Sequence, residues 1–288
     1  MRSTQVHGTM PLMTRIATIA VLVLLLGVAT GCDGDKPDAQ GTVTDGVPTM
    51  DGTMSTAVYL LRDGKVSAVR RTIAATLDPE RSALTRLLDG PTDDEAAGGL
   101  ASAIPKGTEL LDFSLADGLA TVDLDGTFDD GGGSASMLGR VAQVVATLTR
   151  YPTVSRVAFR IDGEPVEAIG GEGVLVDPPL GRRAIEGQTP QILIESPLPW
   201  DQVRSPIRLE GTANVFEATV SIEVRDGTGT VVLEAFTTAT SGTGTRGTFD
   251  TTLTLPTASG TMTIVAFESS AKDGRPIHAT DVQVTVAG

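Results

Sequence analysis

From residue 191 to the C-terminus, hydrophobic residues recur at every second position, and this alternation constrains the fold more than any other feature of the chain. In residues 219–225 it places Val220, Ile222 and Val224 on one face of a strand, with polar residues between them. Because no helical stripe interrupts the alternation, residues 191–288 are predicted to form an immunoglobulin-like sandwich. Its seven predicted strands lie at residues 191–195, 206–213, 219–225, 230–237, 248–255, 261–267 and 277–286.

Residues 56–176 show a different pattern, in which helices alternate with hairpins. Asp-Gly pairs at 63–64, 117–118 and 162–163 each separate two runs of strand-forming residues, which is the signal of a β-hairpin. A first helix is predicted to begin at Pro79 after the N-cap Asp78 and to end before Gly90. A second helix, at 136–150, carries hydrophobic residues at steps of four and three. These elements predict an α+β domain with helices on one face of a mostly antiparallel sheet.

Two segments lack hydrophobic periodicity. Residues 32–55 are rich in Gly, Asp, Thr and Pro and are predicted to be a flexible tether. Residues 177–190 contain the sequence PPLGRR and are predicted to link two domains that fold as separate units. We expect Arg182 and Arg183 in this linker to be solvated; contact with an anionic lipid or wall polymer is the alternative.

The N-terminal 31 residues are predicted to be a signal peptide. A segment with Arg2 and Arg15 precedes an apolar run at 16–30, which is shorter than the ~20 residues of a membrane-spanning helix. The run ends at Ala29-Thr30-Gly31-Cys32, which resembles the bacterial lipobox. Cys32 is therefore predicted to be the lipid attachment site, which would anchor an extracytoplasmic protein to the cell membrane. The alternative is an ordinary signal peptide followed by an incidental cysteine.

The composition argues against several functional classes. A net charge of −14 opposes nucleic-acid binding, because affinity for phosphates comes largely from Lys and Arg. His278 is the only histidine after the predicted signal peptide and Cys32 is the only cysteine, so a Cys/His zinc site is not expected. A Ser-His-Asp hydrolase would depend on His278, and the chain has no G-x-S-x-G motif. We predict no catalytic residue, no metal site and no cofactor.

Two motifs resemble ligand-binding loops but lack essential residues. A calcium loop beginning at Asp123 would need Gly at its sixth position and Glu at its twelfth, where the chain has Phe128 and Ser134. The glycines at 131–133 precede a helix without the G-K-[ST] ending of a phosphate loop. We expect the acidic residues near Asp123 to form a strand end and a solvated turn; a looser oxygen-ligand site is the alternative.

The order of several short motifs resembles two families. In residues 56–176 the motifs resemble the GerM-type sporulation and spore-germination domain, and they are Tyr59-Leu60, Leu88-Asp89-Gly90-Pro91, Ile104-Pro105-x-Gly107-Thr108, Thr147-Leu148-Thr149 and Val157 through Asp162-Gly163. The later motif Gly211-x-Ala213-x-x-Phe216-Glu217-Ala218 resembles the immunoglobulin-like domain of bacterial spore-germination proteins. The resemblance implies this pair of folds and a role in sporulation or germination, and it brings no catalytic constellation.

Two functional classes remain. The first is a lipid-anchored cell-envelope protein whose non-catalytic domains bind peptidoglycan or another envelope protein. The alternative is an envelope enzyme that acts on peptidoglycan through Asp or Glu carboxylates. Trp200, the only tryptophan, lies on a proline-containing connection between the first two sandwich strands. It is either an exposed partner-binding anchor or a core residue at the end of the sandwich, packed against Phe216.

Overall fold

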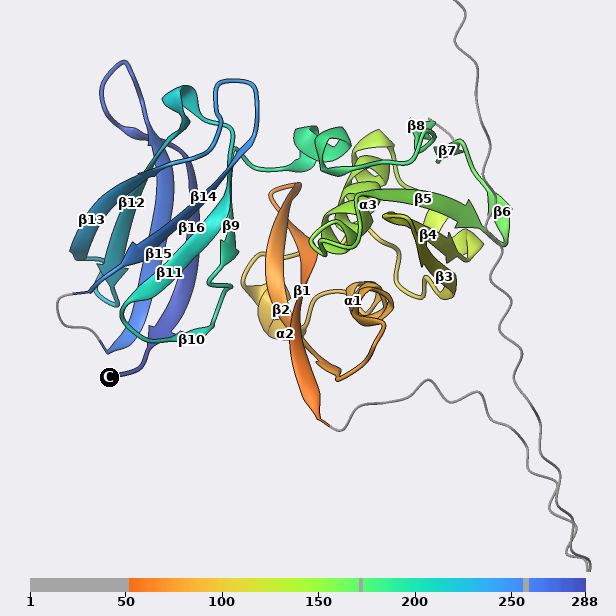
Figure 1. Ribbon diagram of the computed structural model, residues 1–288, viewed down its shortest axis with the longest axis horizontal. Helices are drawn as coiled ribbons and strands as arrows, with labels where there is room; N and C mark the ends of the chain where they lie inside the picture. Colours follow the sequence, from red (N-terminus) through yellow and green to blue (C-terminus); the bar gives the residue numbers. More distant parts are fainter. Residues whose placement is uncertain (1–51, 171–172, 256–258) are drawn as a thin grey trace, which may run out of the picture. The chain divides into compact units, whose positions relative to one another are not determined.

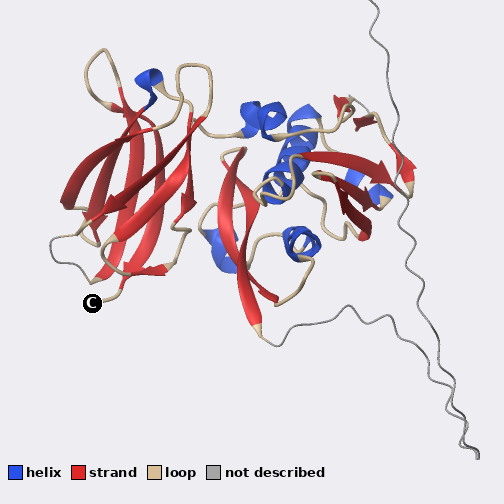
Figure 2. Cartoon of the chain, in the orientation of Figure 1, coloured by secondary structure: helices blue, strands red, loops and turns tan. Residues whose placement is uncertain are grey.

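The fold is that of a computed structural model, which describes residues 52–170, 173–255 and 259–288 (Figure 1). Cys32, the predicted signal peptide and most of the predicted tether lie outside these residues. Strands and helices are mixed up to about residue 190, and strands dominate after it (Figure 2). This order confirms the predicted α+β domain followed by an all-β immunoglobulin-like domain. No helix in the three described ranges is long and apolar enough to cross a membrane.

The N-terminal domain begins with a long hairpin. Its strands, β1 (Thr53–Arg62) and β2 (Lys65–Ala74), pair antiparallel along their whole length. Asp63 and Gly64 between them have φ angles of 51° and 74°. Positive φ at both positions is typical of a type I′ turn, whose twist matches that of the paired strands. The Asp-Gly pairs at 117–118 and 162–163 also have positive φ at both positions, which confirms the three predicted hairpin turns.

The second sheet of this domain has four strands in the order β3-β4-β5-β6. The bounds are β3 (Leu110–Ala116), β4 (Leu119–Leu124), β5 (Arg156–Ile161) and β6 (Glu164–Pro165). β4 and β5 are parallel and the other two pairs are antiparallel, so the sheet is mostly antiparallel as predicted. Because a parallel pair needs a long crossover, η1 (Gly126–Asp129) and α3 (Ser134–Leu148) lie between β4 and β5. A short hairpin of β7 (Ala168–Ile169) and β8 (Val174–Leu175) follows.

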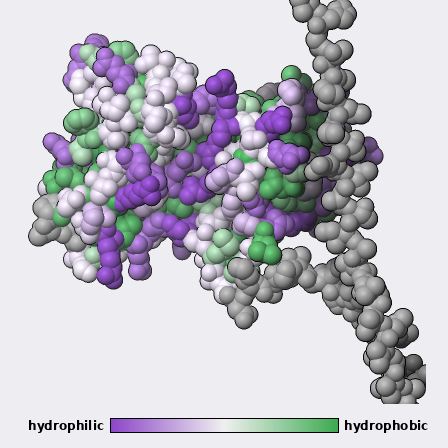
Figure 3. Space-filling view, viewed as in Figure 1, coloured by the Kyte–Doolittle hydropathy of each residue, from purple (hydrophilic) through white to green (hydrophobic). Residues whose placement is uncertain are grey.

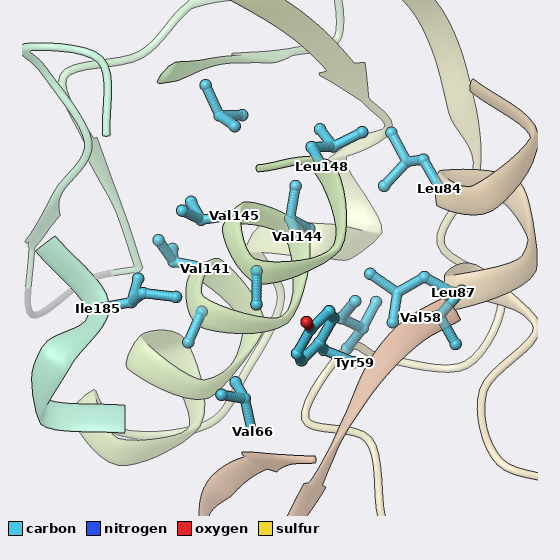
Figure 4. Packing of buried hydrophobic residues seen from close by; sticks show 14 of the residues in the cluster. Val58, Tyr59, Val66, Leu84, Leu87, Val141, Val144, Val145, Leu148 and Ile185 are labelled. Carbon is cyan, nitrogen blue, oxygen red and sulfur yellow. The ribbon is translucent and has the colours of Figure 1, made fainter. Parts of the chain in front are cut away.

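Two helices enclose the core of the N-terminal domain. α1 (Pro79–Leu88) begins as predicted, with the Asp78 side chain accepting a hydrogen bond from Arg81 N. α3 begins and ends two residues earlier than predicted, and it packs on β1 and α1. Figure 4 shows Val141, Val144, Val145 and Leu148 of α3 beside Val58 and Tyr59 of β1 and Leu84 and Leu87 of α1. The hydrophobic stripe read from the sequence therefore faces this core.

The sequence analysis predicted none of the short helices, and two of them lie near the contacts between the domains. α2 (Asp93–Ala97) follows the first predicted helix, and η2 (Arg182–Gln188) lies in the predicted linker. α2 forms around a capping box, in which Thr92 and Glu95 each accept a hydrogen bond from the other's backbone N–H. η2 buries Ile185 against the N-terminal core. The linker thus has fixed structure, because an apolar residue and its backbone find partners there.

The C-terminal domain contains the seven predicted strands. They form two sheets, of order β10-β16-β15-β12-β13 and β14-β11-β9, around a hydrophobic core of their own. β10 is an additional two-residue strand that pairs parallel with β16, and η3 (Phe216–Ala218) precedes β12. The bounds are β9 (Ile192–Ser196), β10 (Gln202–Val203), β11 (Ile207–Ala213), β12 (Thr219–Asp226), β13 (Val231–Thr238), β14 (Gly247–Leu253), β15 (Gly260–Ser269) and β16 (Pro276–Val286).

Gly211 allows a close approach between strands in the smaller sheet. The register of β9 against β11 shifts between Glu210 and Gly211. A Cβ at Gly211 would lie 2.2 Å from the Leu193 carbonyl oxygen and 2.6 Å from the Phe249 ring. No other residue type fits this position without displacing the backbone of β9.

Candidate functional site

Three side chains from distant segments meet beside the linker at residues 177–190, which is called the connection from here on because it joins the two domains. The Tyr59 hydroxyl on β1 donates a hydrogen bond to Glu195 Oε1 on β9. Arg182 on η2 donates to the same oxygen from Nη1 at 3.0 Å and to the Tyr59 hydroxyl from Nη2 at 3.2 Å. Its guanidinium carbon also lies 5.0 Å from the centroid of the Tyr59 ring, a cation–π contact. This cluster ties the N-terminal domain, the connection and the sandwich together.

The expectation that Arg182 is solvated is wrong. Its Nε donates to Thr149 Oγ1 at 3.0 Å and its Nη2 to the Ala146 carbonyl oxygen at 3.2 Å. Both acceptors lie at the C-terminal end of α3, where the helix dipole favours a positive charge. Arg183, in contrast, is exposed and fits the expectation.

The cluster changes the ionisation of its members. Burial, followed by the negative charge of Glu195, raises the pKa of Tyr59 from 10.0 to about 12. Burial opposes the charge on Arg182, yet the contacts with Tyr59 and Glu195 outweigh it and raise the pKa of Arg182. Tyr59 is therefore a neutral hydrogen-bond donor at physiological pH, and Arg182 and Glu195 form an ion pair beside it.

A second cluster holds the other end of the connection on the sandwich. Arg246 donates to both carboxylate oxygens of Glu186, at 2.8 and 3.0 Å, and Asn214 donates to Glu186 Oε1 at 2.9 Å. Arg246 also donates to the Pro190 carbonyl oxygen at 2.7 Å. Although burial opposes it, the hydrogen bonds from Arg246 and Asn214 lower the pKa of Glu186. The connection is thus fixed to the N-terminal domain through Arg182 and to the sandwich through Glu186.

A third contact joins the hairpin of the N-terminal domain to the sandwich directly. Arg70 on β2 donates to both carboxylate oxygens of Asp201, at 2.5 and 2.6 Å. Asp201 also accepts a hydrogen bond from Leu198 N at 2.8 Å. Leu193 and Leu198 of the sandwich belong to the hydrophobic cluster of the N-terminal domain. The described residues accordingly lie in one compact unit.

A cleft of about 890 Å³ opens beside the first two clusters. The end of α3, η2, and residues of β11 and of the 244–248 segment line it. Four of the lining residues are arginines, namely Arg150, Arg182, Arg183 and Arg246. Arg182 and Arg246 are held by Glu195 and Glu186, as described above. Three glutamates also line it, namely Glu186, Glu195 and Glu210, so four arginines leave one net positive charge in the cleft of an acidic chain, and this concave site is the strongest candidate for ligand binding.

Trp200 lies at the surface of the sandwich, next to the N-terminal domain. Trp200 is 45% exposed and is not part of the sandwich core, and Phe216 is 54% exposed. The expected alternative of a buried Trp200 packed on Phe216 is therefore wrong. The Trp200 ring lies against α2 instead, since a Cβ on Gly98 would be 3.3 Å from its Cζ2. Its backbone N–H donates to the Gln283 carbonyl oxygen at 2.7 Å. The role of Trp200 as a partner-binding anchor stays a prediction.

The other residues singled out from the sequence have structural partners. Asp123 accepts a hydrogen bond from Gly163 N at 3.0 Å, and Asp125 accepts one from Glu109 N at 2.8 Å, so these carboxylates close loops. Among the described residues, no group of three or more His, Cys, Asp or Glu side chains is placed to hold a metal ion. His278 is exposed on β16 and lies 2.9 Å from Glu268.

Sequence analysis missed most of the site. Tyr59 belongs to one of the family motifs, whereas no pattern in the sequence distinguishes Glu186, Glu195 or Arg246. A local signal exists for α2, which Trp200 contacts, because Thr92-Asp93-Asp94-Glu95 has the spacing of a capping box. No local signal predicts the clusters around Arg182 and Glu186, since their members are far apart in the sequence.

The chain matches two family models. Residues 57–167 match the model described as sporulation and spore germination, and residues 191–275 match that of the immunoglobulin-like domain of bacterial spore germination. No curated protein matches the chain.

Among solved structures, the first GerMN domain of the sporulation protein GerM from Bacillus subtilis is similar at 22% identity, over 45% of this chain and 98% of that chain, with a TM-score of 0.38. The tandem GerMN domains of the same protein are similar at 14% identity, over 70% of this chain and 62% of that chain, with a TM-score of 0.41.

Proposed function

We propose that this chain is a germination-type protein of the cell envelope that binds a partner without catalysing a reaction. It carries a sporulation and spore germination domain followed by the immunoglobulin-like domain of bacterial spore germination. The tandem of these two domains is the observation that carries the proposal. Neither family description names an enzyme. The partner in this proposal is peptidoglycan or another envelope protein.

The proposal includes a lipid anchor at Cys32. The short apolar run, the small residues before Cys32 and the charged residues after it support a lipoprotein signal. Residues 33–51 would then connect the anchored cysteine to β1, which begins at Thr53. In this arrangement the two domains face the envelope outside the cell membrane.

The contacts between the domains support a binding role for the pair as a unit. The Arg182 and Glu186 clusters and the Arg70–Asp201 ion pair fix the sandwich against the N-terminal domain. When a partner contacts both domains, the protein would lose less conformational freedom on binding than if its domains moved independently. On the face that Figure 3 shows, hydrophilic residues gather across the middle of the described part, which favours a polar partner there.

Co-sedimentation of the full chain with purified cell wall tests the proposal, with released sugars measured in the same supernatant. We expect retention without release. Trp200→Ala is expected to weaken retention if Trp200 is an anchor, and Phe236→Ala is the matched control, because Phe236 is an exposed aromatic residue elsewhere on the sandwich. Sugar release that one Asp→Asn substitution abolishes would overturn the proposal in favour of a carboxylate enzyme. Absence of both retention and release would remove peptidoglycan as the partner.

A further inference from the structure

We propose that the cleft beside η2 binds a small ligand that carries an oxyanion, a carboxylate or a phosphate, through Arg150 and Arg183. This inference rests on the proposed function and deepens it, because it names the chemistry of what the two-domain unit would hold. The cleft volume of about 890 Å³ lies within the usual range of small-ligand sites.

The argument begins with the charges that are already paired. Each carboxylate in the cleft lining has an arginine partner: Glu195 pairs with Arg182, Glu186 with Arg246, and Glu210 with Arg208 at 2.9 Å. Glu195 and Glu186 are therefore neutralised locally and offer little repulsion to an anion that enters the cleft, whereas Glu210 shares Arg208 with Asp250.

Arg150 and Arg183 differ from the other two arginines of the lining. Both are exposed, and neither forms an ion pair or donates a side-chain hydrogen bond to any residue within the described ranges. Two guanidinium groups with all their donors free thus face one concave surface. The Thr245 hydroxyl in the same lining also makes no hydrogen bond to the described part of the chain.

The free groups determine the class of ligand. A guanidinium presents parallel N–H donors that match the oxygens of a carboxylate or a phosphate, and such charge-assisted pairs are stronger than neutral hydrogen bonds. The wall of a cleft displaces water and lowers the local dielectric, so the same pair is stronger there than on an open surface. The net charge of −14 repels anions from most of the protein, and this cleft is a local exception.

The cleft is also held in shape without a ligand. Arg182 fixes η2 to α3, and the Glu186–Arg246 pair fixes η2 to the sandwich, so the two walls are already in place. Binding therefore needs little ordering beyond the side chains of Arg150 and Arg183. Its concave form favours a small ligand over a flat membrane surface.

Calorimetric titration of the full chain with citrate and, separately, with inorganic phosphate tests the proposal. We expect at least one of the two to bind. Arg150→Gln and Arg183→Gln are each expected to weaken that binding about tenfold, the loss typical of one hydrogen-bonded charge contact. Arg204→Gln is the matched control, since Arg204 is an exposed arginine outside the cleft without an ion pair in the described residues. The ligand that binds identifies the oxyanion.

Stability measurements separate binding from folding. Because neither arginine forms a side-chain hydrogen bond or an ion pair in the described structure, the double variant is expected to melt within a few degrees of the natural protein. The proposal would be overturned if neither anion binds, or if the double variant binds as well as the natural protein. Retention on cell wall would still test the proposed function independently. Loss of adsorption to anionic phospholipid vesicles in the double variant, without binding of either free anion, would also overturn it.

Discussion

Replacing Tyr59 by Phe removes one hydroxyl from the centre of the interdomain cluster and leaves the rest in place. The ring stays under the Arg182 guanidinium, and the Arg182–Glu195 ion pair is kept. The variant loses the hydrogen bond to Glu195 and the one that the hydroxyl accepts from Arg182. Tyr59 is fully buried. Buried hydrogen bonds to charged groups contribute ~1.5–3 kcal/mol each, partly offset here because the ion pair survives, so we expect a loss of about 2 kcal/mol at neutral pH.

The same substitution changes the response to alkaline pH. The pKa of Tyr59 is 10.0 in the unfolded chain and about 12 in the folded protein. A raised pKa means that the folded state favours the neutral phenol, so this stabilisation is fully present below pH 10 and is lost as the pH rises through about 12. The shift corresponds to about 3 kcal/mol, which is similar to the loss expected from the substitution itself. The stability curves of the natural protein and of Tyr59→Phe should therefore converge between these pH values.

Urea unfolding of the full chain at a series of pH values measures this difference, followed by circular dichroism and by the fluorescence of the single tryptophan. Tyr151, whose pKa is raised by burial, is present in both proteins and cancels in the comparison. Near-ultraviolet absorbance of tyrosinate gives the titration of Tyr59 independently. A gap below ~0.5 kcal/mol at neutral pH, or a gap that stays constant up to about pH 12, would refute the role assigned to Tyr59.

Three further predictions concern single residues. Gly211→Ala should destabilise the protein by roughly 3 kcal/mol or more in chemical unfolding, because the new Cβ would lie 2.2 Å from the Leu193 carbonyl oxygen; a loss below ~1 kcal/mol would contradict the close approach. Cys32→Ala should move the protein out of the detergent phase in phase partitioning, and a variant that stays there would show that the lipid is not on Cys32. Trp200, 45% exposed, should emit at long wavelength and be quenched readily by acrylamide, and Trp200→Ala should cost less than the ~3–5 kcal/mol typical of a buried tryptophan. Blue, protected emission would contradict this placement.

Local patterns in the sequence were sufficient for most of the fold. The Asp-Gly turns, the Asp78-Pro79 helix start and the two-residue alternation after residue 191 each depend on neighbouring residues, and the structure contains the elements they predict. The boundaries of α3 moved by two residues, which is a usual error at helix ends. α2 was not predicted although the sequence contains its capping box, because the acidic, glycine-rich composition of residues 91–100 is more typical of a loop. The independent folding of the two domains stays a prediction.

The sequence by itself determined the two fold types, their order and the predicted site of lipid attachment, because each follows from short-range periodicity or a local motif. Only the tertiary structure decided which charges are paired. Tyr59 and Glu195 are 136 positions apart, and Arg70 and Asp201 are 131 apart. No local pattern relates such residues, since their pairing depends on how whole elements pack. For the same reason, two adjacent arginines have different environments: Arg182 lies among α3, β1 and β9, and Arg183 lines a cleft with its donors free.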